Sequence, residues 1–330
     1  MKKILITIFA VSFLAILSGC GSVPTTSGQA ETLKIVTTIF PEYDWVRQIL
    51  GDHTENVQLT MLLDEGVDLH SFQPTADDMI AISSCDLFIY VGGESDSWVK
   101  DALTNASNSH MQVINLMELL GNRVKEEEIV EGMEHDHEDH DSVDEGTDSH
   151  SHETDEHVWL SLKNAKVLCT GIADRLCALD PANAEDYHQN LQSYLKQLDR
   201  LDADYQNVVD TSPHQTVLFG DRFPFRYLVD DYGLDYYAAF SGCSAETEAS
   251  FETVTFLANK ADELELNCVL TIENANHTIA QTIVNNTAGK NQQVLVMDSM
   301  QAITAQDVQD GASYLEIMEQ NLDVLKHALQ

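Results

Sequence analysis

Several short apolar runs of this sequence are followed by a histidine or a carboxylate, and side chains of these types can bind a metal ion. The runs are candidate β-strands, and the residues that follow them are His70, Asp221, Glu273 and Asp298. In open α/β sheets, ligands bind in the crevice beyond the carboxyl ends of the strands. Imidazole nitrogen and carboxylate oxygen both coordinate divalent metals. We therefore expect a metal site at this rim, although any one of these residues alone has ordinary structural roles, such as capping a helix.

A second group of metal-binding side chains lies between Glu126 and Glu156. This stretch has fifteen acidic residues and no Lys or Arg. Its five histidines are His135, His137, His140, His150 and His152. It has too few large apolar side chains to fold alone, so we predict a mobile loop with several weak, exchangeable zinc sites. The chain re-enters the fold at His157, which is a further candidate ligand.

The histidine-rich stretch does not have the spacing of a zinc protease. Two histidines four positions apart on one helix, with a Glu between them, are needed for that chemistry. Neither His137–His140 nor His152–His157 has this spacing. A metallohydrolase would also need a general base and an open coordination position, and no motif supports Glu273 in that role. We therefore expect a protein that is not an enzyme.

The N-terminus has the pattern of an export signal. A basic start is followed by an apolar run from Ile4 to Leu17 and by Ser18-Gly19-Cys20. The run is shorter than the roughly 20 residues of a membrane-spanning helix. This pattern predicts a signal peptide over residues 1–20, with Cys20 as the lipidated residue of a bacterial lipobox. Residues 21–31 are rich in Gly, Ser, Thr and Pro and indicate a flexible tether, so we expect the protein outside the cytoplasm, held by lipid.

Charge and cysteine content narrow the functional classes further. The formal net charge of −38 argues against nucleic acid as a partner and suits the attraction of cations. Five cysteines follow Cys20, an odd and scattered set without a CxxC pair, which does not indicate a disulfide framework. Most are expected to be small buried apolar residues, whereas Cys243 stays a candidate ligand.

Apolar runs alternate with helical patterns in both halves of the chain, which predicts an α/β fold with parallel sheets. The expected elements of the second half include strands over Thr216–Phe219 and Cys268–Ile272 and a helix over Ala305–Leu329. We expect an N-terminal lobe over residues 32–163, with the loop at 126–156, and a C-terminal lobe over residues 213–330. Residues 164–212 between them have helical periodicity and predict a stiff linker helix. Asp180-Pro181 resembles a helix start, so a break is expected there.

Several segments resemble a known family. The segment Gly66–Pro74 matches its most specific motif, with Leu69 where Pro is usual. Ile35–Pro41 resembles its first strand and turn, Asp155–Leu160 its second histidine motif, and Leu179–Leu198 its linker helix. Over nearly the whole mature chain, the sequence is similar to the cluster A-I metal-binding lipoproteins of ABC importers, the zinc and manganese solute-binding family.

The resemblance implies two parallel-sheet lobes joined by a long rigid linker helix, with the metal in the cleft between the lobes. It carries over His70 and His157 as ligands from the N-terminal lobe and Asp298 as the carboxylate ligand from the C-terminal lobe. The cargo would be Zn²⁺, with Mn²⁺ as the alternative, passed to a membrane permease by a monomeric protein. A surface metal buffer or adhesion lipoprotein without a transport role is the other possibility.

The third ligand is where the sequence departs from the family. The third histidine of the family falls at about Arg222, and a guanidinium cannot ligate a metal. Asp221 is adjacent and is our choice for its replacement, while Glu273 and Cys243 stay open. Arg222 itself could pair with a carboxylate and tune the site.

Overall fold

The computed structural model describes residues 32–134, 154–244, 248–273 and 275–330. Residues Leu33–Gln330 form one compact unit. The predicted signal peptide with Cys20, the tether and the five loop histidines (135, 137, 140, 150 and 152) lie outside the described residues. Within the described ranges, no helix is both long enough and apolar enough to cross a bilayer.

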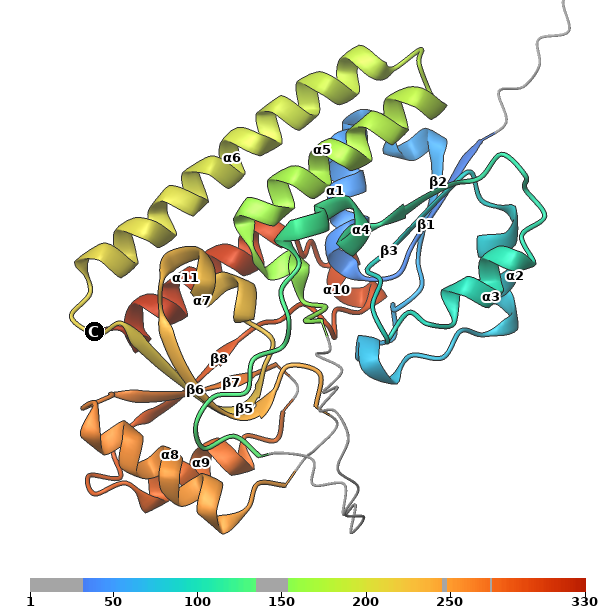
Figure 1. Cartoon of the computed structure of the whole chain (residues 1–330). Coiled ribbons are helices and arrows are strands. Elements are labelled where there is room, and N and C mark those ends of the chain that lie inside the picture. Colours follow the sequence, from blue (N-terminus) through green and yellow to red (C-terminus); the bar gives the residue numbers. More distant parts are fainter. Residues whose placement is uncertain (1–31, 135–153, 245–247, 274) are drawn as a thin grey trace, which may run out of the picture. The chain divides into compact units, whose positions relative to one another are not determined.

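The first sheet has four parallel strands in the order β2-β1-β3-β4 (Figure 1). Its strands are β1 (Leu33–Thr37), β2 (Val57–Met61), β3 (Leu87–Tyr90) and β4 (Gln112–Asn115). Its helices are α1 (Phe40–Leu50), α2 (Ala76–Ser84), α3 (Val99–Thr104) and α4 (Leu116–Leu120). The start of α1 follows from its sequence, because Pro41 suits a first helical turn and the Glu42 carboxylate accepts hydrogen bonds from the N–H groups of Thr38 and Ile39.

The second sheet repeats this plan in the order β6-β5-β7-β8, again with all strands parallel. Its strands are β5 (Thr216–Phe223), β6 (Asp235–Ser241), β7 (Cys268–Ile272) and β8 (Gln293–Met297). The helices of this half of the chain are α7 (Arg226–Tyr232), α8 (Phe251–Glu263), α9 (Thr278–Asn286), α10 (Ala305–Gln309) and α11 (Tyr314–Ala328). The two parallel sheets with flanking helices confirm the predicted α/β class.

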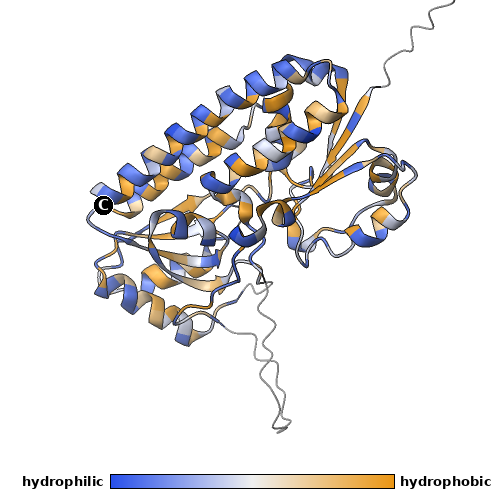
Figure 2. Cartoon of the chain, turned by 45° about the horizontal axis from the view of Figure 1, so that its top comes forward, coloured by the Kyte–Doolittle hydropathy of each residue, from blue (hydrophilic) through white to orange (hydrophobic). Residues whose placement is uncertain are grey.

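The segment between the sheets forms two helices, α5 (Leu162–Leu179) and α6 (Ala184–Thr211), which lie side by side (Figure 1). The predicted break is present, but Asp180 ends α5 and Asn183 precedes α6. The Asp180 carboxylate accepts hydrogen bonds from the Asn183 amide and the Tyr187 hydroxyl, which holds the turn between the helices. The buried residues of α6 recur at helical spacing, and Figure 2 shows alternating apolar and polar colours along this helix.

Two predicted boundaries are wrong. The helix expected over residues 305–329 is divided into α10 and α11, because Gly311 has a φ of 102° and Ser313 caps the new helix with its side chain. The strand expected to end at Phe219 continues to Phe223, with a register shift against β6 after Phe219. Asp221 therefore lies inside a strand rather than in the turn after it.

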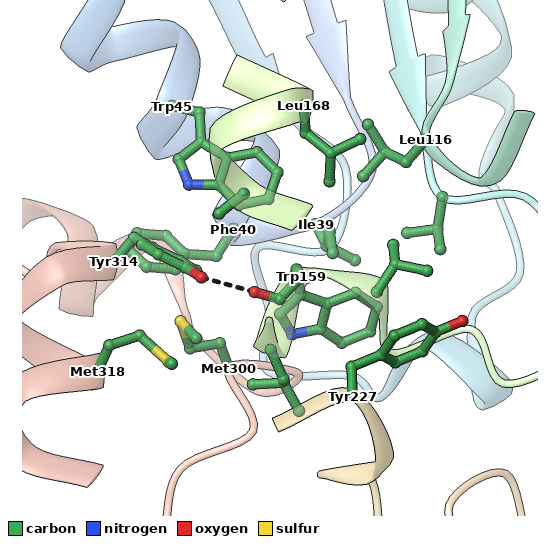
Figure 3. Close-up of a cluster of buried hydrophobic side chains, with 14 of the residues drawn as sticks. Ile39, Phe40, Trp45, Leu116, Trp159, Leu168, Tyr227, Met300, Tyr314 and Met318 are labelled. Atoms are coloured by element: carbon green, nitrogen blue, oxygen red, sulfur yellow. Dashed lines mark hydrogen bonds between the residues drawn. The ribbon is translucent and has the colours of Figure 1, made fainter. Parts of the chain in front are cut away.

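A buried cluster around Trp159 joins segments that are distant in the sequence (Figure 3). The Trp159 indole N–H donates to the carbonyl of Ser299 at 2.9 Å, and the Tyr314 hydroxyl donates to the carbonyl of Trp159 at 2.6 Å. The Tyr314 ring packs edge to face against Trp45 of α1, with 5.2 Å between the ring centroids. The short helical turn that contains Trp159 (Val158–Leu160) is thus fixed on several sides.

Replacing Tyr314 with Phe removes the hydroxyl that donates to the Trp159 carbonyl. Because that carbonyl is buried, we expect the free energy of unfolding to fall by about 1–2 kcal/mol. Urea denaturation measures this change. Tyr43→Phe, at a partly exposed position of α1, is the matched control and should change stability by less than about 0.5 kcal/mol. Equal stability losses in the two variants would contradict the role given to this hydrogen bond.

Candidate metal centre

His157 is fully buried and is held in one orientation by Asp155. Asp155 Oδ1 accepts hydrogen bonds from the backbone N–H of His157 at 2.8 Å and from its Nδ1 at 3.0 Å. An ionised carboxylate can only accept, so Nδ1 carries a hydrogen and Nε2 of the neutral ring presents a lone pair. A carboxylate behind the imidazole is the usual arrangement of a metal-binding histidine.

His70 lies in a short helical turn, Leu69–Ser71, after β2. The Asp68 carboxylate caps this turn by accepting the backbone N–H of His70 at 2.9 Å. Nδ1 of His70 lies 2.7 Å from the Ser95 hydroxyl and 3.7 Å from Glu156 Oε2. These contacts again occupy Nδ1 and leave Nε2 facing the cleft.

The two Nε2 atoms of His70 and His157 lie 3.3 Å apart. Two Zn–N bonds of about 2.0–2.1 Å at a tetrahedral angle place the nitrogens about 3.3 Å apart. When each Nδ1 carries the ring hydrogen, two lone pairs face each other at this distance, and they repel unless a cation lies between them. The pair has the geometry and the donor type of a divalent metal site.

Cys243 is the third member of this group. Among the described residues, one set of three His, Cys, Asp or Glu side chains has its ligand atoms within 4.8 Å of one another, and it consists of His70, His157 and Cys243. Cys243 follows the end of β6, and its backbone N–H donates to Glu127 Oε1 at 2.9 Å. Sequence reasoning kept Cys243 only as an alternative, because a lone cysteine after a strand gives no signal by itself.

The structure places Asp221 and Asp298 outside this three-residue group. The Asp221 carboxylate accepts hydrogen bonds from the Thr271 hydroxyl at 2.5 Å and from the backbone N–H of Arg222. Asp298 accepts the backbone N–H of Met300 at 2.7 Å. Coordination by either carboxylate stays a prediction, and it would require exchanging these hydrogen bonds for a bond to the metal.

Glu273, the other open candidate, also lies outside the group. Its carboxylate accepts hydrogen bonds from the backbone N–H and the hydroxyl of Ser299, and from the backbone N–H of Gln301. It therefore connects the end of β7 to the segment after β8.

Arg222 pairs with a carboxylate of the other lobe. Its guanidinium lies 2.6 Å from Asp68 Oδ2. Burial alone would raise the pKa of Asp68, but the Arg222 charge and hydrogen bond lower it. Arg222 thus keeps Asp68 ionised, and Asp68 in turn caps the turn that presents His70.

The two histidines differ in their affinity for a proton. Burial, followed by the charge of His157, lowers the pKa of His70 to about 4. Burial would also lower the pKa of His157, but the Asp155 charge and hydrogen bond outweigh it and raise that pKa above its usual value. The proton that competes with a metal is therefore held mainly by His157.

A cavity of about 490 Å³ adjoins the site. It is lined by residues of both lobes, among them Asp68, His70, Arg222 and His277. His70 borders this cavity, whereas His157 is fully buried behind it. A metal ion would therefore enter from the His70 side and reach His157 last.

Asp155→Asn should weaken zinc binding about tenfold at pH 8, because the amide keeps the shape of the carboxylate but not the charge that strengthens His157 as a ligand. As pH falls, wild-type affinity should begin to drop above about pH 6.5, since the pKa of His157 is raised. The zinc affinity of the variant should begin to drop only at a lower pH. The difference in zinc affinity between the two proteins should therefore become smaller as pH falls. Competition with a zinc-binding dye between about pH 8 and 5.5 measures both effects.

The control for this experiment is Asp174→Asn, which removes one negative charge from an exposed position of α5. It should follow the wild-type curve. If zinc affinity depends on pH in the same way in Asp155→Asn and in this control, Asp155 does not strengthen His157 as a ligand.

The chain is similar to known proteins over almost its whole length. The family model described as ZnuA, zinc-uptake complex component A periplasmic, matches residues 35–328. Zinc-binding lipoprotein AdcA of Streptococcus pneumoniae is 29% identical over 326 residues, which cover 99% of this chain and 61% of that protein. High-affinity zinc uptake system protein ZnuA of Bacillus subtilis is 29% identical over 326 residues, which cover 98% of this chain and 96% of that protein.

Solved structures share the fold. The Zn(II)-bound ZnuA-like domain of Streptococcus pneumoniae AdcA superposes with a TM-score of 0.68 at 25% identity, covering 90% of this chain and 99% of that chain. The laminin binding protein of Streptococcus agalactiae has a TM-score of 0.69 at 22% identity, covering 90% and 100%. Because the family model matches most of the sequence, this chain belongs to the family of the periplasmic component A of zinc-uptake complexes.

Proposed function

We propose that this protein captures Zn²⁺ outside the cytoplasm and delivers it to the membrane permease of an ABC importer. The observation that carries the proposal is the pair of imidazole Nε2 atoms 3.3 Å apart, each with its other ring nitrogen already engaged. His70 and His157 are the ligands in this proposal. Zinc is the cargo and is bound and released without covalent chemistry.

The names of the relatives support zinc as the cargo. The Bacillus subtilis relative, described as a zinc uptake protein, is matched over 96% of its length. The chain spans 61% of the length of the Streptococcus pneumoniae relative, so the activity of that longer protein is carried over here only as part of this proposal. Imidazole ligands also favour zinc over manganese, because at equal ligands Zn²⁺ binds more tightly than Mn²⁺.

The route to the membrane is also part of the proposal. Cys20 would carry the lipid anchor, and the histidine-rich loop would collect metal near the tight site. The negative charge of the chain would raise the local concentration of cations around a monomeric, anchored receptor. The likeness to a laminin-binding protein carries the fold alone at 22% identity and gives adhesion no support.

A double variant, His70→Ala with His157→Ala, should abolish the single tight zinc site seen by titration calorimetry. Wild-type protein should bind one zinc tightly and manganese more weakly, whereas loop sites should appear only as weak additional binding. The matched control is His53→Ala with His188→Ala, two histidines outside the group, and it should retain the tight site. Tight binding of one equivalent by the first double variant would refute the proposed ligands.

Growth of cells in zinc-depleted medium tests the transport step. Cells without the protein should grow poorly, and growth should return with added zinc or with the wild-type gene but not with the His157→Ala gene. Normal growth without the protein would instead favour a surface metal buffer.

A further inference from the structure

We propose that Cys243 is the third zinc ligand, so that the cation is held by two imidazole nitrogens and one thiolate. This inference rests on the proposed function and adds a third ligand to the same zinc site. A thiolate is a soft ligand that suits zinc, whereas manganese prefers oxygen ligands. Cys243 would therefore make the site selective for zinc over manganese.

The distances suit a shared ion. Zn–N bonds of about 2.0–2.1 Å and a Zn–S bond of about 2.3 Å at a tetrahedral angle give a sulfur-to-nitrogen distance of about 3.6 Å. The Cys243 sulfur and one ring nitrogen of each histidine lie within 4.8 Å of one another. A side-chain movement on the order of 1 Å would complete the coordination geometry.

The backbone at Gly242, immediately before Cys243, lies close to the His157 ring. A Cβ at Gly242 would lie 3.0 Å from Cε1 of His157 and 2.9 Å from the carbonyl oxygen of Phe223. A larger residue would push the chain away from the imidazole, so glycine permits the close approach. The hydrogen bond from the Cys243 N–H to Glu127 fixes the segment from the other side. Two independent contacts therefore hold the backbone that carries this thiol beside His157.

Among the described residues of the C-terminal lobe, no imidazole belongs to this group, and His277 lies on the adjoining cavity instead. The position where the family resemblance implies a histidine is Arg222, whose guanidinium cannot ligate a metal and pairs with Asp68. This ion pair uses the Asp68 charge, and the carboxylates of Asp155 and Glu156 lie against the Nδ1 side of the imidazoles, outside the group of ligand atoms, so a directly bound anion would help to balance the dication. A thiolate, which a coordinated cysteine becomes, supplies that charge.

The other described cysteines are less suited to this role. Cys85, Cys169 and Cys268 are free and buried in the apolar core. Cys177 is partly exposed, and its sulfur lies 3.7 Å from Nε2 of His188, so it is the one alternative cysteine–histidine pair to control for.

Cobalt spectroscopy tests the inference directly. Co²⁺ substitutes for Zn²⁺ and gives a near-ultraviolet charge-transfer band when a thiolate is bound. In the full chain with Cys20→Ala, one equivalent of Co²⁺ should give this band. The band should vanish in Cys243→Ser and persist in Cys177→Ser. Zinc affinity should fall at least tenfold in Cys243→Ser, while manganese affinity should change less than threefold.

The outcomes separate this inference from the proposed function. Tight cobalt binding without the band in the protein that retains Cys243 would overturn the thiolate ligand and leave the two histidines as the zinc site. Loss of the band in Cys177→Ser rather than in Cys243→Ser would overturn it as well. Tight zinc binding by the His70→Ala, His157→Ala protein would instead overturn the proposed function. The cobalt spectrum of the protein that retains Cys243 does not depend on whether the Cys243→Ser variant folds.

Discussion

The hydrogen bond between Asp155 and Nδ1 of His157 is the constraint on which the site depends. It fixes a hydrogen on the inner ring nitrogen and directs the outer lone pair toward the equivalent atom of His70. Full burial of His157 removes water that could otherwise satisfy that lone pair. With His70 in the same tautomer, two acceptors face each other, and a cation bound between them would satisfy both lone pairs.

The scaffold keeps this arrangement rigid through the segment that follows His157. Trp159 is buried between helices from both ends of the chain, and it is hydrogen-bonded to Ser299 and Tyr314. The residue that approaches from the C-terminal lobe, Cys243, is held by Glu127, which precedes the five loop histidines in the sequence. Both lobes therefore contribute side chains to the group of candidate ligands, and the ion pair of Arg222 with Asp68 joins the lobes on the cavity side.

Much of the fold follows from local patterns in the sequence. The apolar run Cys268–Ile272 was predicted as a strand with the bounds that the structure shows, because alternation with helices marks parallel strands clearly. Gly311 divides a helix that periodicity alone made continuous, and its positive φ is a backbone property that apolar spacing does not report. Local sequence predicts Asp221 in a turn, whereas it lies inside β5. The register shift within β5 depends on pairing with β6, and this tertiary effect is not visible in the local sequence.

The site was only partly predictable for the same reason. His70 and His157 stand in recognisable segments, and the structure brings their nitrogens together. The place of Cys243 depends on Glu127, 116 positions earlier, and on the space left by Gly242, neither of which is visible as a motif. The hydrogen bond between Cys243 and Glu127 forms only when the chain packs into its fold, so no single stretch of sequence predicts it.

X-ray absorption at the zinc edge of the protein loaded with one equivalent of zinc would identify the atoms bound to the metal. We expect two imidazole nitrogens at about 2.0–2.1 Å, recognised by multiple scattering from the rings, with one sulfur at about 2.3 Å. A shell of oxygen atoms without imidazole scattering would contradict it, because the cation would then lie away from His70 and His157.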